Sequence, residues 1–442
     1  MIRNFPSVVT LAAAAALLSG CGIINKKPKA TPTVGDRVAV LVNELDIAVD
    51  AATAALPMVL PPATANPEWG QSGGNSAKLV QHVALRESVG QAFSVSIGNG
   101  SSNSRRLGGG PVVAGGKVYT IDTAGSVRAF DAGTGTALWA GRFGEDKGNS
   151  NVVYGGGVAV DGGRVYATNG LGYVAAFDAA TGAPVWTVRP GGPLRGAPTV
   201  ANGAIYVISQ DNQLYSLKSA DGSTGWSSAA ALEIAGVFGN GSPAVARGTV
   251  VAGFSSGELN AYRYENGRMV WQDALSRTSI STAVAALSDI DADPVIAEGV
   301  VYALGQGGRM VALDILSGQR LWELNMAGIS TPWIAGDWLF AVNDRAQLIA
   351  VQRTTGKVRW INQLPRWRNE KKKTGVISYA GPVLAGGRLY LAGTSGVLVT
   401  VNPTDGATQS QGEIGGSVRF QPVVANQTMY LLTDAGRLIS YR

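Results

Sequence analysis

The stretch Pro111-Val-Val-Ala-Gly-Gly-Lys-Val-Tyr119 returns in variant form eight times along the 442 residues of the chain. The first and last positions of the eight copies are Pro111/Tyr119, Val158/Tyr166, Pro198/Tyr206, Pro243/Val251, Pro294/Tyr302, Pro332/Phe340, Pro382/Tyr390 and Pro422/Tyr430. Successive copies begin 47, 40, 45, 51, 38, 50 and 40 residues apart. A period of about 40–50 residues is typical of a propeller or another array of repeats, not of a domain with a single core.

Each repeat has the pattern of β-strands. Residues 111–122 (PVVAGGKVYTID) are rich in β-branched and aromatic residues around a Gly-Gly pair, which indicates a hairpin. A third strand and an Asp-x-x-Thr/Ser-Gly turn follow, as in GYVAAFDAATGAPVW at residues 172–186. The aspartate can accept hydrogen bonds from the turn backbone, and the glycine allows a positive φ. With a further strand before each proline, we predict an all-β fold: an eight-bladed β-propeller with four antiparallel strands per blade.

The two ends of the repeat region indicate how the ring closes. The last repeat stops after a third strand, residues 436–442 (GRLISYR), whereas residues 91–97 (QAFSVSI) resemble an isolated fourth strand with Phe93 at the tryptophan position. We expect this N-terminal strand to complete the C-terminal blade, because an unpaired strand edge invites association with other chains. The propeller is therefore expected to span residues 90–442.

A tryptophan recurs once per blade, at Trp139, Trp186, Trp226, Trp271, Trp322 and Trp360, and Ser410 breaks the series. A large ring at a fixed position of the repeat favours packing between neighbouring blades. Stacking on a sugar or a quinone is the alternative.

The first residues have the pattern of an export signal. Arg3 precedes an apolar stretch at residues 8–18, which is too short to span a bilayer. The sequence Leu18-Ser-Gly-Cys21 then resembles a bacterial lipobox, and Cys21 is the only cysteine of the chain. We therefore predict a signal peptide at residues 1–20 and lipidation of Cys21. Gly22 in place of aspartate implies export to the outer membrane, with the protein anchored at its periplasmic face. The alternative is an ordinary cleavage site beside a stray cysteine.

Residues 21–89 are interpreted as a lipidated N-terminal linker because they are rich in lysine, proline and alanine near the anchor. Residues 66–74 are expected to pack on the propeller, since Trp69 would be poorly placed in water. The net charge of +6 is mild for a chain of this length and gives no indication of nucleic acid binding.

Few residues are available for catalysis. His82 is the single histidine and precedes the ring, which excludes a Ser-His-Asp site inside the ring and metal sites built on imidazole. The sequence from Asp289 to Asp293 (DIDAD) resembles the start of a calcium loop. However, Pro294 stands where such a loop needs glycine, and Val300 where it needs glutamate. We therefore predict no metal, no cofactor and no enzymatic activity.

The blade motif resembles that of pyrroloquinoline-quinone dehydrogenases, which would imply a periplasmic quinoprotein. Those enzymes characteristically carry adjacent cysteines, and this chain has none besides Cys21. The quinoprotein is kept as the alternative function.

An insertion after Trp271 carries a second resemblance. Its sequence Leu287-Ser-Asp-Ile-Asp291, running into Pro294-Val-Ile-Ala-Glu-Gly-Val-Val-Tyr-Ala, resembles the BamB family, lipoproteins of the outer-membrane β-barrel assembly machinery. The resemblance covers about residues 90–442. It implies a non-enzymatic scaffold that binds the periplasmic POTRA domains of BamA and assists the folding and insertion of outer-membrane proteins. Other assembly lipoproteins and unfolded outer-membrane proteins would be further partners.

The resemblance also implies contact residues. They are Leu287, Asp289 and Asp291, with Val237 and Phe238 as apolar neighbours. A family stretch of the form Leu-x-Leu-Arg aligns with residues 235–238 (AGVF), where the arginine is missing. The alternative is that the two aspartates only cap their own loop. A second insertion, residues 366–373 (RWRNEKKK), is interpreted as a solvated basic loop, with contact to a partner or the membrane surface as the alternative.

Overall fold

The computed structural model describes residues 47–144, 153–233, 239–275 and 288–442. These residues belong to one compact unit, Leu45–Arg442. Within them no helix is both long and apolar enough to cross a membrane. Cys21 and the predicted signal peptide lie outside the described residues.

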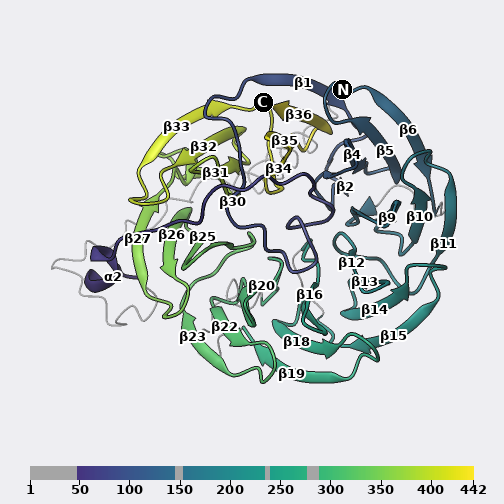
Figure 1. Cartoon of the computed structure of the whole chain (residues 1–442), viewed down its shortest axis with the longest axis horizontal. Coiled ribbons are helices and arrows are strands. Elements are labelled where there is room, and N and C mark those ends of the chain that lie inside the picture. Colours follow the sequence, from purple (N-terminus) through teal and green to yellow (C-terminus); the bar gives the residue numbers. More distant parts are fainter. Residues whose placement is uncertain (1–46, 145–152, 234–238, 276–287) are drawn as a thin grey trace, which may run out of the picture. The chain divides into compact units, whose positions relative to one another are not determined.

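The described residues form eight four-stranded antiparallel sheets arranged around a common axis, and the predicted eight-bladed propeller is confirmed (Figure 1). Blades 1 to 4 consist of β3 (Val112–Ala114), β4 (Lys117–Ile121), β5 (Ser126–Asp131) and β6 (Ala137–Arg142); β8 (Val158–Asp161), β9 (Arg164–Thr168), β10 (Val174–Asp178) and β11 (Pro184–Val188); β12 (Thr199–Ala201), β13 (Ala204–Ile208), β14 (Gln213–Lys218) and β15 (Thr224–Ala229); and β16 (Ala244–Ala246), β17 (Thr249–Gly253), β18 (Glu258–Arg263) and β19 (Met269–Ala274).

Blades 5 to 8 consist of β20 (Val295–Ala297), β21 (Val300–Leu304), β22 (Met310–Asp314) and β23 (Arg320–Leu324); β24 (Trp333–Ala335), β25 (Trp338–Val342), β26 (Gln347–Gln352) and β27 (Val358–Gln363); β30 (Tyr379–Ala385), β31 (Arg388–Gly393), β32 (Val397–Val401) and β33 (Thr408–Glu413); and β34 (Val423–Ala425), β35 (Thr428–Leu432), β36 (Arg437–Tyr441) and β1 (Gln91–Ser96). Outside the blades lie α2 (Ala51–Ala55), the parallel pair β2 (Arg105–Arg106) with β7 (Val153–Tyr154), and the hairpin β28 (Trp367–Asn369) with β29 (Thr374–Val376).

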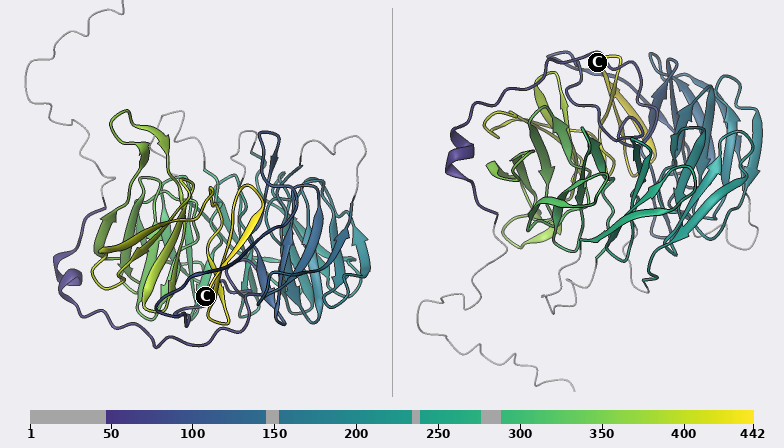
Figure 2. Two further views of the ribbon diagram at one scale, coloured as in Figure 1. Left: turned by 90° about the horizontal axis from the view of Figure 1, so that it is seen from above. Right: turned by 60° about the horizontal axis from the view of Figure 1, so that its bottom comes forward.

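The antiparallel order gives the ring two different rims. Turns between the first and second and between the third and fourth strands, such as residues 115–116 and 132–136, form what we call the turn rim. Links between the second and third strands and between consecutive blades, such as residues 122–125 and 288–294, form the loop rim. The β28–β29 hairpin projects from the loop rim (Figure 2).

The hydrophobic core lies between neighbouring blades. Alternating residues of the third strands, such as Val127 and Ala129 in β5 and Val311 and Leu313 in β22, are fully buried. The predicted Asp-x-x-Thr/Ser-Gly turns follow these strands. The Oδ1 atom of Asp178, for example, accepts hydrogen bonds from the backbone of the two residues before its turn glycine at 3.1 and 2.8 Å.

The recurring tryptophans join each blade to the next. The indole N–H of each donates to a backbone carbonyl in the turn between the third and fourth strands of the following blade. The six pairs are Trp139–Ala179, Trp186–Ser219, Trp226–Tyr264, Trp271–Ile315, Trp322–Arg353 and Trp360–Pro403, at 2.7–3.2 Å. The glycine of that turn lies against the ring. A Cβ on Gly318 would be 2.6 Å from the Trp271 ring, so no larger residue fits without displacement. The predicted inter-blade packing role is therefore confirmed.

Two glycines with similar backbones allow a matched test of this contact. Gly318 (φ +71°) faces Trp271, whereas Gly203 (φ +73°) has open space at its Cβ position. We expect Gly203→Ala to destabilise the protein by about 1–2 kcal/mol, the cost of a left-handed alanine. Gly318→Ala should cost a further 1–3 kcal/mol or so, since the methyl group overpacks the ring. Urea unfolding measures both, and equal losses would show that the Trp271 contact tolerates the extra carbon.

The sheet of the last repeat takes its outer strand from β1, which precedes the first blade in the sequence. The strand order is β1-β36-β35-β34, with Phe93 opposite Ser440 and Val95 opposite Leu438. Gly90 and Arg442 exchange backbone hydrogen bonds of 3.1 and 2.9 Å. Phe93 lies against Gly135 of the first blade, as the tryptophans do at the other turns.

Residues 66–85, which we call the strap, follow the inner ends of the blades around the axis (Figure 1). The strap hydrogen-bonds in order to the innermost strand of every blade. Its bonds are Trp69–Val113, Gly70–Val160, Gln71–Val200, Ser76–Val245, Ala77–Ile296, Gln81–Trp333 and Val83–Leu384, and Asn66 bonds Val424 at the start of the circuit. Trp69 is 2% exposed and stacks on Trp333.

The structure therefore differs from the expected linker at residues 21–89. Residues 47–89 belong to the same compact unit as the blades. Before the strap, α2 contacts β27, and Asp50 N donates to Val358 O at 2.9 Å. The predicted packing of residues 66–74 on the propeller is confirmed. The contacts of the remaining residues were not predicted, because they are mainly backbone hydrogen bonds to distant strands and bury few large side chains.

Truncation tests whether the segment before β1 is a linker or a stabilising part of the propeller. Removal of residues 1–46 is expected to leave the midpoint of urea unfolding unchanged. Removal of residues 1–89 retains β1 but exposes the inner strand ends and the apolar site of Trp69. We expect a loss of at least about 5 kcal/mol, since loss of one buried tryptophan alone typically costs 3–5 kcal/mol. Equal stability of the two truncations would show that the strap is dispensable.

Candidate functional site

The segment that carries the family resemblance lies on the loop rim between blades 4 and 5. Its described part, residues 288–294, is packed into the protein. Ile290 is 1% exposed, and its backbone N–H donates to Phe254 O at 3.1 Å. The Ser288 hydroxyl donates to Ser255 O at 3.1 Å. The segment is therefore fixed on blade 4 at two points.

Asp289 and Asp291 point into the protein and face an arginine from another blade connection. Arg195 lies in the link between β11 and β12. Its Nη2 atom is 2.8 Å from Asp291 Oδ1 and 3.9 Å from Asp289 Oδ1. The exposed fractions of the three side chains are 4% for Arg195, 0% for Asp289 and 7% for Asp291. Buried pairs of this kind contribute little net stability, but removing one partner is strongly destabilising.

Two further residues complete this cluster. Gln306, in the turn between β21 and β22, donates from Nε2 to Asp291 Oδ2 at 2.6 Å. Gly239 lies so close to the pair that a Cβ there would overlap Asp291 Oδ1. Only glycine allows the chain to pass at this point.

Burial raises the pKa of Asp291 from 3.8 to about 6. Arg195 opposes this increase, while the nearby Asp289 carboxylate adds to it. One arginine is thus shared by two buried carboxylates, and Asp291 accepts a proton more readily than it would in water.

The difference in unfolding free energy between wild type and Asp291→Asn tests this pKa. The folded-state pKa lies above the unfolded value, so between about pH 4 and 6 the native protein binds more protons than the unfolded chain. The wild-type protein should therefore lose about 2–3 kcal/mol relative to the non-titrating variant as the pH rises through this window. Urea unfolding at a series of pH values gives the difference. A constant difference, or one that grows in favour of wild type, contradicts the raised pKa.

A second buried cluster joins the loop rim to the strap. Asp293 accepts hydrogen bonds from Ser242 N at 2.7 Å and from the Ser72 hydroxyl at 2.6 Å. Lys78 of the strap lies 4.0 Å from the same carboxylate and donates to Thr199 Oγ1 at 2.9 Å. Burial lowers the pKa of Lys78 to about 8, and Asp293 opposes the decrease. These contacts hold the strap inside the ring.

The axis of the ring contains a cavity of about 280 Å³ between the strap and the loop rim. Ser72 lines it from the strap side. Asp291, Gln306, Tyr379 and Arg419 line it among the blade links. Within the described residues, no group of three or more histidine, cysteine, aspartate or glutamate side chains could hold a metal ion.

The structure changes how the predicted contact residues are understood. Leu287, Val237 and Phe238 lie outside the described residues. Asp289 and Asp291 are described, but they are buried and paired with Arg195, so they neither stand free in solvent nor merely cap their own loop. The family resemblance placed an arginine at residues 235–238, in the link between blades 3 and 4. Arg195 lies in the preceding link, between blades 2 and 3, and was therefore not predicted.

Comparison with known proteins identifies the family. The sequence profile described as "Outer membrane protein assembly factor BamB" matches residues 123–362, more than half of the chain. The chain belongs to the BamB family. It is 28% identical to BamB of Yersinia pestis over 336 residues, covering 75% of this chain and 83% of that protein. It is 29% identical to BamB of Escherichia coli over 391 residues, covering 79% and 88%. The predicted resemblance is confirmed, and the family supports a role in outer-membrane protein assembly.

Solved structures agree on the fold. The crystal structure of BamB from Moraxella catarrhalis superposes with a TM-score of 0.68 at 19% identity, covering 80% of this chain and all of that one. Quinohemoprotein alcohol dehydrogenase from Comamonas testosteroni superposes with a TM-score of 0.65 at 15% identity, covering 86% and 81%. At these identities the likeness shows a shared fold only.

Proposed function

We propose that this BamB-family protein is a non-enzymatic scaffold of the outer-membrane β-barrel assembly complex that binds the periplasmic POTRA domains of BamA. The match of the family profile over residues 123–362 carries the proposal. The lipobox supports a lipid anchor on Cys21, which would hold the protein at the periplasmic face of the outer membrane.

We assign partner binding to the loop rim. Large apolar side chains are exposed there on three different links between blades: Leu232 at 70%, Ile329 at 50% and Val376 at 55%. We infer that these three side chains become covered when a partner binds. The strap lies at the end of the axis opposite the β28–β29 hairpin (Figure 2), and we infer that a partner reaches the axial cavity from the loop rim.

Asp289 and Asp291 act in this proposal by fixing the rim. Their carboxylates hold Arg195 and thereby tie the link before blade 5 to the link before blade 3. A partner would bind the surface that this pair holds in place, because buried carboxylates cannot present their charge directly. Reversing both charges would disrupt the cluster itself and so is a poor test of binding.

The alternative quinoprotein has the shared propeller fold in its favour. The family match favours the assembly role instead. Purification of the protein from detergent-solubilised outer membranes distinguishes the two. Co-purification of a BamA-type insertase supports the scaffold, and a quinone absorbance band in the isolated protein supports the enzyme.

Two exposed aliphatic residues on opposite rims provide a matched test of the surface. Leu232 (70% exposed) lies on the loop rim, and Val59 (75% exposed) lies on the segment that leads to the strap. Calorimetry with purified POTRA domains should show about tenfold weaker binding for Leu232→Asp, since burying an unpaired charge in an apolar contact costs more than 1 kcal/mol. Val59→Asp should bind like wild type. The reverse pattern would place the partner on the turn rim, and equal binding by both variants would remove Leu232 from the interface.

A further inference from the structure

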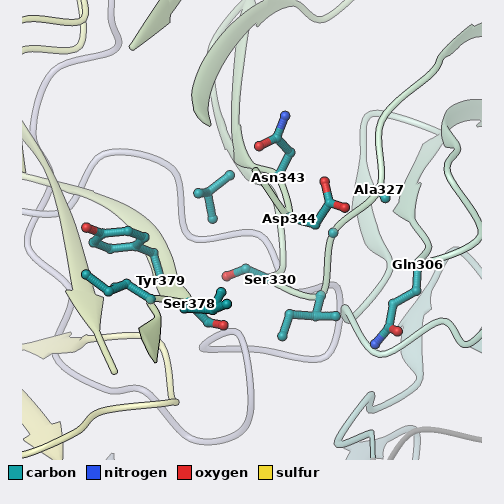
Figure 3. Close-up of a pocket in the computed structure, with 12 residues that line it drawn as sticks. Gln306, Ala327, Ser330, Asn343, Asp344, Ser378 and Tyr379 are labelled. Carbon is teal, nitrogen blue, oxygen red and sulfur yellow. The ribbon is translucent and has the colours of Figure 1, made fainter. Parts of the chain in front are cut away.

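A second cavity, of about 350 Å³, opens on the loop rim beside the axial one (Figure 3). Its walls come from links of blades 5, 6 and 7. The lining residues are Gln306, Ala327, Gly328, Ile329, Ser330, Val342, Asn343, Asp344, Val376, Ile377, Ser378 and Tyr379. Gln306 and Tyr379 lie on opposite sides, with Asp344 between them. The volume is at the lower end of the range of ligand sites in proteins.

Asp344 is the only acidic residue among the described ones that line this cavity. Its backbone is fixed, because Asp344 N donates to Ala327 O at 3.0 Å and the neighbouring Asn343 caps the same turn. Among the described residues, the ion pairs on this rim involve other carboxylates, such as those of Asp291 and Asp434, and none includes Asp344. Asp344 is exposed, so a ligand in the cavity can reach its carboxylate, and a cationic group there would gain a favourable charge contact.

Two arginines contribute to the electrostatics of Asp344. Burial raises the pKa of Asp344, and Arg345 and Arg366 oppose the increase without forming an ion pair with it. The guanidinium of Arg366 lies over the Trp367 ring, 5.2 Å from its centroid. The backbone N–H groups of Asp344 and Arg345 also lower its pKa. A carboxylate has about four acceptor positions, so some remain for a guanidinium.

The remaining walls of the cavity are partly apolar. Ile329 and Val376 are 50% and 55% exposed, although both are aliphatic. Tyr379 adds an aromatic ring whose hydroxyl is already bonded to Pro365 O at 2.9 Å. A ligand that fits these walls combines a positive group with an apolar stem.

We propose that this cavity binds an arginine side chain, presented between apolar residues on an extended segment of the partner. The guanidinium would pair with Asp344, and its alkyl stem would cover Ile329 and Val376. Arginine fits better than lysine because its planar group can bond a carboxylate through two N–H groups, stacks on aromatic rings and loses less hydration on burial. The identity of the partner as a POTRA domain rests on the proposed function. The proposal that the cavity binds an arginine side chain does not depend on that function.

The first experiment tests the cavity without the partner. Protein with ¹³C-labelled isoleucine methyl groups is titrated with the peptide acetyl-Leu-Arg-Leu-amide and with its citrulline counterpart, which has the same shape but no charge. We expect the Ile329 methyl signal to shift with the arginine peptide and the citrulline peptide to bind at least about tenfold more weakly. Asp344→Asn should remove this difference. Asp337→Asn, on the turn rim of the same blade and exposed, should retain it. Equal binding of the two peptides by wild type overturns the proposal, whatever the stability of the variants.

The second experiment tests the partner. Calorimetry with purified POTRA domains should give about tenfold weaker binding for Asp344→Asn than for Asp337→Asn, with unchanged thermal unfolding of both. If wild type does not bind POTRA domains, the proposed function fails, and the peptide titration still decides the cavity. If wild type and Asp344→Asn bind POTRA domains equally, the assignment of this cavity to that partner is wrong. If Asp344→Asn unfolds at lower temperature yet still distinguishes arginine from citrulline, the carboxylate is structural and the proposal is overturned.

Discussion

The ring depends on one repeated contact: an indole N–H on the outer strand of a blade donates to a carbonyl in the turn of the next blade. This bond sets both the distance and the angle between adjacent sheets, and the turn glycine permits the close approach. The series breaks at Ser410, whose hydroxyl instead bonds Thr400 within the same blade. Every link of the loop rim begins and ends on these sheets. The tryptophan contacts therefore help to determine the relative positions of the links that form any site on this rim.

The strap adds a second constraint, on the inner ends of the sheets. The innermost strand of a blade has an unpaired edge that faces the axis, and unpaired buried backbone groups are costly. A single segment that bonds all eight innermost strands satisfies part of this requirement and also occupies the axis. The axial cavity is therefore bounded on one side by the strap residue Ser72 and opens among the links of the loop rim. The position of the strap is therefore one reason to propose that a partner approaches from the loop rim.

The sequence predicted the repeat, the turns and the role of the tryptophans, because each of these features is local or periodic. The Asp-x-x-Thr/Ser-Gly turn, for example, is formed by neighbouring residues alone. The sequence also predicted that residues 66–74 pack on the propeller, which the structure confirms, but it did not predict the rest of the strap or the pairing of Arg195 with Asp291. Those contacts join residues far apart in the chain, and their partners depend on which blade links meet at the axis. Trp69 was the one local signal of the strap, since a large apolar ring in a polar segment needs a place to be buried.

The difference between local and long-range contacts also affects how acidic residues on the loop rim should be interpreted. A family motif rich in aspartate suggests a charged binding surface, but burial and pairing with Arg195 leave Asp289 and Asp291 little charge to offer a partner. Asp344 belongs to no recognised motif, yet it lines an open cavity with aliphatic neighbours. On this rim, pairing and burial decide which carboxylate can recognise a partner and which one only positions the backbone. Negative charge in the sequence is therefore a poor guide to the binding surface unless the cations that neutralise it are also located.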